Sequence, residues 1–121
     1  MYQILIVDDD MNFRRSLVIQ LEFEGFSVTE VESASQGLAF LEKRRKGQKH
    51  PDIIITDVRM PEMNGDEFVV CLQKQYPNVP VILISAFDLP EEMAGYPFLR
   101  KPFKIQELID TANALVQDRS Q

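Results

Sequence analysis

The stretch that decides the fold is residues 53–61, which read Ile-Ile-Ile-Thr-Asp-Val-Arg-Met-Pro. Its first half is uncharged and rich in β-branched side chains, which is typical of a strand buried on both faces of a parallel sheet. The run ends at Asp57, and Pro61 disfavours helix at Met60, so the chain should turn away from the sheet there. Open α/β sheets bind ligands beyond the carboxyl ends of their strands, so Asp57 is a candidate site residue, although a single Asp in this place often only caps a turn.

The composition is that of one domain. The chain has 121 residues, 45% of them hydrophobic, which is enough for one core and too little for two. The net charge of -6 argues against broad binding to nucleic acid or to anionic membrane. Cys71 is the only cysteine, which excludes an internal disulfide and a cysteine metal cluster. The first apolar run, residues 4–7, is too short for a signal or a membrane span, so we expect a cytoplasmic location.

Strand-like and helix-like segments alternate along the chain. Strands are predicted at residues 4–7, 26–31, 52–57, 79–84 and 97–100. Helices are predicted at residues 12–23, 34–45, 66–76 and 105–117. Between them, residues 86–96 contain Pro90 and Gly95 and have room only for a short helix at 89–94. This alternation predicts an α/β fold with one five-stranded, doubly wound parallel sheet that carries helices on both faces.

Polar side chains stand at four of the five predicted strand ends. They are Asp8 and Asp9 after the first strand, Asp57 after the third, Ser85 after the fourth and Lys101 after the fifth. In a parallel sheet these ends lie along one edge. Taken singly, the first two acids could cap a helix, the serine could form a turn and the lysine could be an ordinary surface residue. Together, the polar side chains at the four strand ends predict a ligand-binding site at this edge of the sheet.

Carboxylates beside one hydroxyl and one ammonium suit a divalent cation and a phosphoryl group. Mg²⁺ takes oxygen ligands and keeps several waters, so two or three carboxylates suffice, and Mn²⁺ is an expected substitute. The cation would draw electrons from the phosphoryl oxygens, while Lys101 and Ser85 would hold the remaining ones. In this interpretation Asp57 is the nucleophile and forms an aspartyl phosphate.

Four short pieces of the sequence form a characteristic set. They are Ile-Val-Asp-Asp-Asp at 6–10, Asp-Val-Arg-Met-Pro-Glu-Met-Asn-Gly at 57–65, Ile-Ser-Ala at 84–86 and Leu-Arg-Lys-Pro-Phe at 99–103. With these pieces the chain resembles, over nearly its full length, the receiver domain of two-component response regulators, the CheY-like superfamily. The resemblance implies a flavodoxin-like (βα)5 fold for residues 1–118, with 119–121 as a tail or the start of a linker.

The resemblance also implies a phosphoacceptor and its metal ligands. Asp57 would receive a phosphoryl group from a histidine kinase or a phosphotransfer domain in a phosphorelay. The Mg²⁺ ligands would be Asp8, Asp9, Asp57 and the backbone carbonyl of Arg59. By this resemblance the domain is a phosphoprotein of signal transduction and not an enzyme, because it assists only its own phosphorylation and dephosphorylation.

Other residues would read out the phosphoryl group. By the resemblance, Ser85 would bond a phosphoryl oxygen and Lys101 would pair with it, with Lys101–Pro102 as a cis peptide. Phe98 stands in the place of the family's aromatic switch residue, which turns inward as Ser85 moves toward the phosphate. The switch would control a downstream target or an output domain that the sequence does not identify.

Two features depart from the family pattern. Ser85 and Lys101 are 16 positions apart, shorter than usual by roughly one to two helical turns, so the fourth helix should be abbreviated. Because the family signals through the fourth helix, the fifth strand and the fifth helix, the output surface and a homodimer through that face are left open. The second departure is that Arg59 and Phe87 add bulk beside the site, and we predict that they hinder the attacking water and lengthen the phosphoryl lifetime.

Two other functions fit part of the pattern. A phosphatase of the haloacid dehalogenase type also places an Asp after an apolar strand, but it needs a second Asp two residues later, where this chain has Arg59. A receiver-like module that only docks partners is the other alternative, although every acceptor-site residue is present. The prediction is therefore a phosphorylation-controlled switch that does not itself bind nucleic acid or membrane.

Overall fold

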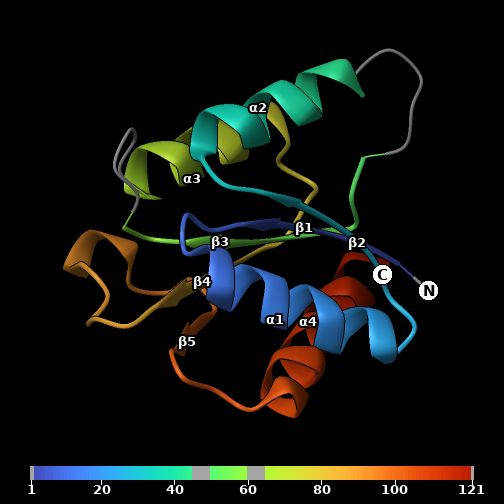
Figure 1. Ribbon diagram of the computed structural model, residues 1–121. Coiled ribbons are helices and arrows are strands. Elements are labelled where there is room, and N and C mark those ends of the chain that lie inside the picture. Colours follow the sequence, from blue (N-terminus) through green and yellow to red (C-terminus); the bar gives the residue numbers. More distant parts are fainter. Residues whose placement is uncertain (1, 45–49, 60–64, 121) are drawn as a thin grey trace.

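The computed structural model describes residues 2–44, 50–59 and 65–120 (Figure 1). The sheet is parallel, with the strand order β2-β1-β3-β4-β5. The elements in chain order are β1 (Gln3–Val7), α1 (Met11–Phe23), β2 (Ser27–Val31), α2 (Ala34–Lys43), β3 (Ile53–Asp57), α3 (Gly65–Gln75), β4 (Val81–Ser85), the 3-10 helix η1 (Glu91–Met93), β5 (Phe98–Arg100) and α4 (Ile105–Ser120). The predicted doubly wound α/β fold is confirmed.

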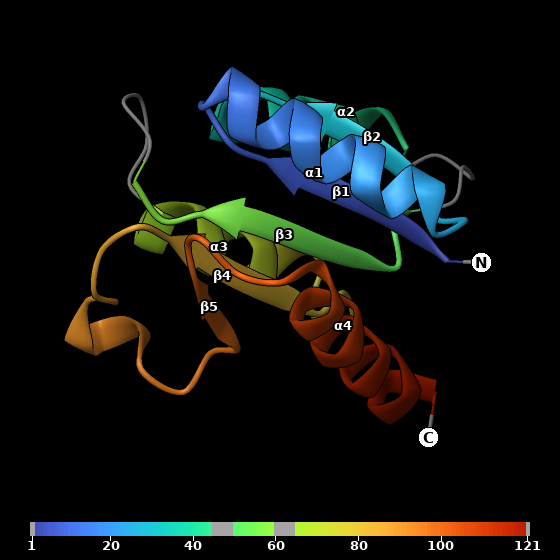
Figure 2. The ribbon, with the colours of Figure 1, turned by 60° about the horizontal axis from the view of Figure 1, so that its bottom comes forward.

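Helices cover both faces of the sheet. Figure 2 shows α1 and α4 in front of the sheet, with α2 and α3 behind it. The side chains of β1 alternate between the two faces, as the pleat of a strand requires: Ile4 and Ile6 pack in the core under α1 and α4, whereas Leu5 and Val7 pack in the core under α2 and α3. All five residues of β3 and of β4 are buried, in keeping with their interior position and with the uncharged residues that precede Asp57 and Ser85. The edge strand β2 is less buried, as its alternating sequence predicts.

The crossover between β4 and β5 differs most from the others. Only the three residues of η1 are helical there, where a short helix at 89–94 was predicted. Pro90 precedes η1 without a side-chain cap, and Gly95 follows at a φ of 100°, a conformation that ends a helix. The abbreviated fourth helix is therefore confirmed, and it is shorter than predicted.

The ends of three other helices differ from expectation. The cap of α1 is Asp10, whose side chain accepts the Phe13 N–H at 3.1 Å, so neither of the two preceding acids caps this helix. Helix α4 extends to Ser120, three residues beyond the predicted end. Helix α2 ends at Lys43, with Arg44 as its C-cap, two residues before the predicted end. The predicted turns at residues 60–61 and 64 lie outside the described residues. No helix in the described part of the chain is both long and apolar enough to cross a membrane.

Gly37 marks a close approach of α2 to the buried core. A Cβ at this position would lie 3.2 Å from Phe68 Cζ and 3.4 Å from Val7 Cγ2, and Phe68 is fully buried. The change Gly37→Val is therefore expected to lower the free energy of unfolding by about 1–3 kcal/mol, because a packed core resists added volume. Urea denaturation measures the loss. Ala39→Val, at an exposed position of the same helix, is the control, and equal losses in the two variants would contradict the close approach.

Candidate functional site

The carboxyl ends of four strands come together at one edge of the sheet. Asp8 follows β1 and Asp57 ends β3, and with Asp9 their carboxylate oxygens lie within 4.8 Å of one another. Asp8 and Asp57 are buried, whereas Asp9 is exposed to solvent. Lys101, from the end of β5, reaches the same cluster. The structure thus brings together three of the four polar strand ends that the sequence singled out.

Lys101 bridges the two buried carboxylates. Its Nζ donates to Asp8 Oδ2 at 2.7 Å and to Asp57 Oδ2 at 2.9 Å. The same Nζ lies 4.2 Å from the centre of the Phe13 ring on α1, a cation–π contact. Burial by itself lowers the pKa of Lys101, but the hydrogen bonds from Asp8 and Asp57 outweigh it and raise the pKa. The ammonium therefore stays charged and offsets part of the negative charge of the cluster.

Burial raises the pKa of the Asp8 carboxyl, and the hydrogen bonds from Lys101 and from the Asp10 N–H oppose that rise. The Asp10 N–H donates to Asp8 Oδ1 at 2.9 Å, so both carboxylate oxygens have donors. Asp8 and Lys101 form an ionised pair, because a separation of 2.7 Å is that of a charge-assisted hydrogen bond. The Asp8 side chain is consequently held rigidly at the end of β1.

The fourth polar end, Ser85, is buried at the end of β4, between β3 and β5. Its Oγ accepts the Phe87 N–H at 3.0 Å, and its carbonyl accepts the Lys101 N–H at 2.8 Å. On the neighbouring loop, Asp57 Oδ1 accepts the Arg59 N–H at 2.9 Å. The Arg59 guanidinium stacks 4.2 Å above the Phe87 ring. The two bulky residues singled out in the sequence therefore contact each other and join the loops that follow β3 and β4.

Phe98 lies apart from the carboxylates, in β5 opposite Leu83. It is partly buried and packs against the core that contains Val58 and Met93, on the face of the sheet covered by α2 and α3. The peptide bond between Lys101 and Pro102 is cis, as the resemblance implied.

Sequence reasoning missed Arg14, which supports the site from α1. Only 8% of Arg14 is exposed, and its Nη1–H donates to the carbonyl of Asp8 at 2.8 Å, while its Nε–H donates to Glu30 at 2.8 Å. The helical spacing of the sequence could have indicated this burial, because it places Arg14 on the inward face of α1 with Leu17, Val18 and Leu21. A basic residue on such a face needs a buried acceptor, and the end of β1 supplies one.

The donor set at this edge fits Mg²⁺. The three clustered side chains offer only carboxylate oxygens, which hard divalent cations prefer over nitrogen or sulfur ligands. The exposed Asp9 leaves one side of the cluster in contact with water, as a cation that retains several waters needs.

The sequence model of one protein family, described as the response regulator receiver domain, matches residues 4–113. The chain belongs to this family. Among curated proteins, this receiver domain is 28% identical over 120 residues to the probable transcriptional regulatory protein TcrX of Mycobacterium tuberculosis, covering 94% of the chain and 49% of TcrX. It is 35% identical over 105 residues to the transcriptional regulatory protein GlrR of Escherichia coli, covering 82% of the chain and 22% of GlrR. The chain thus spans half or less of these two relatives.

Solved structures agree with the assignment. The Francisella response regulator 1452 receiver domain is 31% identical, with a TM-score of 0.82 and 100% coverage of both chains. The response regulator TrrA of Thermotoga maritima, solved in complex with Mg²⁺–BeF, is 26% identical with a TM-score of 0.82, covering 95% of this chain and 99% of TrrA. The receiver fold therefore covers the chain essentially from end to end.

Proposed function

We propose that this receiver domain accepts a phosphoryl group on Asp57, from a histidine kinase or a phosphotransfer domain. The observation that carries the proposal is the position of Asp57 among acidic side chains, with its Oδ2 bonded to Lys101 at 2.9 Å. A carboxylate in this position can act as a nucleophile while a fixed ammonium stands ready for the oxygens that it acquires. Apart from assisting its own phosphorylation and dephosphorylation, the domain would have no enzymatic activity.

The residues proposed to hold Mg²⁺, or Mn²⁺ in its place, are Asp8, Asp9, Asp57 and the backbone carbonyl of Arg59. The Mg²⁺–BeF complex of TrrA supports this assignment by likeness. When bound, the cation supplies positive charge that neutralises phosphoryl oxygens. Asp8, held by Lys101 and by the Asp10 N–H, would need little rearrangement to serve as a ligand.

The chain's own residues would carry the transfer and its readout. A carboxylate oxygen of Asp57 forms the bond to phosphorus as the bond between phosphorus and the donor nitrogen breaks. Lys101 then pairs with a phosphoryl oxygen, and Ser85 gives up its bond from the Phe87 N–H and donates its hydroxyl to another. Phe98 packs in the same core as Val58, the residue after Asp57, so a shift at the site would reach its ring.

We propose that the phosphorylated domain, expected in the cytoplasm, controls an output domain or a separate partner. TcrX and GlrR are named transcriptional regulatory proteins and are longer than this chain, which supports an output beyond the receiver. Direct binding of nucleic acid by the receiver itself is not proposed, because its net charge is -6.

The test is phosphorylation by a small donor. The full chain is incubated with acetyl phosphate and Mg²⁺ and its intact mass is measured. We expect one added phosphoryl group with Mg²⁺ and none when EDTA removes the metal. An unchanged mass with acetyl phosphate, and with a phosphorylated histidine kinase as donor, would overturn the proposal and favour a module that only docks partners.

The stacked pair Arg59 and Phe87 is expected to slow the loss of the phosphoryl group. Since the two side chains contact each other in the loops that follow Asp57 and Ser85, they should hinder the water that attacks phosphorus. We expect the double variant Arg59→Ala/Phe87→Ala to lose its phosphoryl group severalfold faster, measured as the decay of the phosphorylated mass after removal of the donor. The control is Arg44→Ala/Phe23→Ala, which removes the same kinds of side chain at the carboxyl ends of α2 and α1, outside the acidic cluster. Equal decay rates in the two variants would contradict a shielding role.

A further inference from the structure

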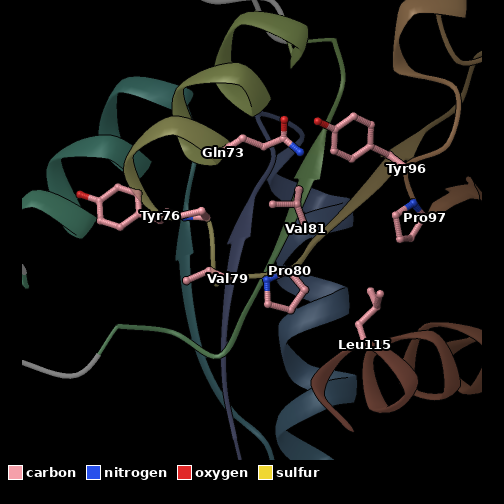
Figure 3. A pocket seen from close by; sticks show the side chains of 9 residues that line it. Gln73, Tyr76, Val79, Pro80, Val81, Tyr96, Pro97 and Leu115 are labelled. Atoms are coloured by element: carbon pink, nitrogen blue, oxygen red, sulfur yellow. The ribbon is translucent and has the colours of Figure 1, made fainter. Parts of the chain in front are cut away.

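The short crossover between β4 and β5 leaves one side of α3 open. In the part of the chain that the structure describes, the only helical element of this crossover is η1, and only its Met93 is buried in the core on the face that α2 and α3 cover. Beside it, a hollow of about 150 Å³ is lined by Asp66, Val69, Val70, Glu92, Met93 and Tyr96. A second hollow, of about 200 Å³, lies farther along α3. Figure 3 shows the side chains that line it, among them Gln73, Val81, Tyr96 and Leu115.

The two hollows form a line along one face of α3. Val70 lines the first hollow and Gln73 the second, and residues three apart are neighbours on a helix surface. Tyr96 lines both hollows and lies between them. We call this surface the α3 groove. Helix α3 has 11 residues and is therefore about 16 Å long, the length of three turns of a second helix laid beside it.

The chemistry of the groove is apolar on its floor and acidic at one end. Val69 and Met93 are buried beneath it, and Val70, at 50% exposed, is one of five large apolar side chains that lie exposed in the described part of the chain. Asp66 and Glu92 flank the apolar floor. The described residues that line this first hollow include no lysine or arginine, so the two carboxylates have no cation within it.

We propose that the α3 groove binds a basic amphipathic helix of a partner protein. Apolar side chains on successive turns of that helix insert at Val70 and beyond Tyr96, while its lysine or arginine residues pair with Asp66 and Glu92. Charge complementarity selects this occupant over an acidic or purely apolar one, since the chain as a whole carries a net charge of -6. The proposal concerns the unphosphorylated chain, so it stands or fails independently of the chemistry at Asp57.

The test is an NMR titration of the ¹⁵N-labelled full chain. The probe is a synthetic amidated peptide of about 14 residues, with leucines at helical spacing on one face and lysines on the other. We expect amide shifts concentrated at Val69, Val70, Gln73, Glu92 and Tyr96. No shifts at millimolar peptide would overturn the proposal, as would shifts spread evenly over the acidic surface.

Variants separate the groove from general charge attraction. Asp66→Asn/Glu92→Gln is expected to weaken peptide binding roughly three- to tenfold, the effect of losing two exposed ion pairs. The control Glu22→Gln/Glu24→Gln removes the same charge at exposed positions outside the groove and should leave the affinity unchanged. An equal effect of the two double variants would overturn the assignment.

Val70 tests the apolar contact. Val70→Lys is expected to abolish binding, because it places a like charge in the path of the peptide, whereas Val70→Leu should preserve it. Both changes are at a half-exposed position, and thermal unfolding confirms that the variants fold. If sedimentation instead shows a dimer of this chain that Val70→Lys dissociates, the groove belongs to a second copy and the proposal of a basic partner helix is wrong.

Discussion

The change Asp57→Asn is expected to abolish phosphorylation by acetyl phosphate in the presence of Mg²⁺. The amide that replaces the carboxylate is a poor nucleophile and cannot form an acyl phosphate. Its size is nearly the same, and an amide oxygen can still accept the Arg59 N–H that now bonds Asp57 Oδ1 at 2.9 Å. The loss should therefore reflect chemistry and not unfolding. Intact mass measures it, and circular dichroism confirms the fold.

The matched control for this prediction is Asp10→Asn. Asp10 is two residues after Asp8, but its side chain caps α1, and asparagine caps helices as well as aspartate does. This variant should still be phosphorylated. A phosphoryl group that persists in Asp57→Asn and disappears in another aspartate variant would show that the acceptor is misassigned.

The change Lys101→Met is expected to lower the free energy of unfolding by about 3 kcal/mol in the presence of EDTA. The Lys101 ammonium bonds both Asp8 and Asp57, so its removal leaves two buried carboxylates facing each other. We place the loss at the low end for a broken buried ion pair, because protonation of one carboxylate limits the repulsion. Urea denaturation in EDTA measures the effect.

Mg²⁺ should then stabilise the Lys101→Met variant more than the natural chain. In the natural chain the ammonium already offsets the charge of Asp8 and Asp57, whereas in the variant a bound cation would be needed to do so. The control is Lys104→Met, which makes the same replacement at an exposed position. If both variants lose the same stability in EDTA, the bridge by Lys101 does not hold the cluster together.

Local patterns account for what could be predicted. The uncharged β-branched run before Asp57 predicted a fully buried strand, and the alternating residues after Phe26 predicted a less buried one; β3 and the edge strand β2 confirm both. Pro90 and Gly95 predicted that the fourth crossover would lack a long helix. These predictions succeeded because burial and backbone restriction act over a few neighbouring residues.

Local sequence patterns could not predict side-chain contacts between segments that are far apart in the chain. Arg14 reaches the carbonyl of Asp8 and the side chain of Glu30 only because α1 packs beside β1 and β2. The stacking of Arg59 on Phe87 depends on the loops after β3 and β4 being neighbours. Sequence identified both residues of that stack as bulky groups near the site, but it did not predict that they touch.

The sequence by itself determined the parallel α/β fold, because the alternation of strands and helices follows from short-range periodicity. It also placed acidic, hydroxyl and amine groups at one edge of the sheet, because parallel strands all end at the same edge. Only the tertiary structure decided that Lys101 bridges Asp8 and Asp57, residues 93 and 44 positions away, and that one side of α3 stays open. The reason is that strand order and the packing of a short crossover are settled by the whole core at once, and no local stretch of the chain encodes them.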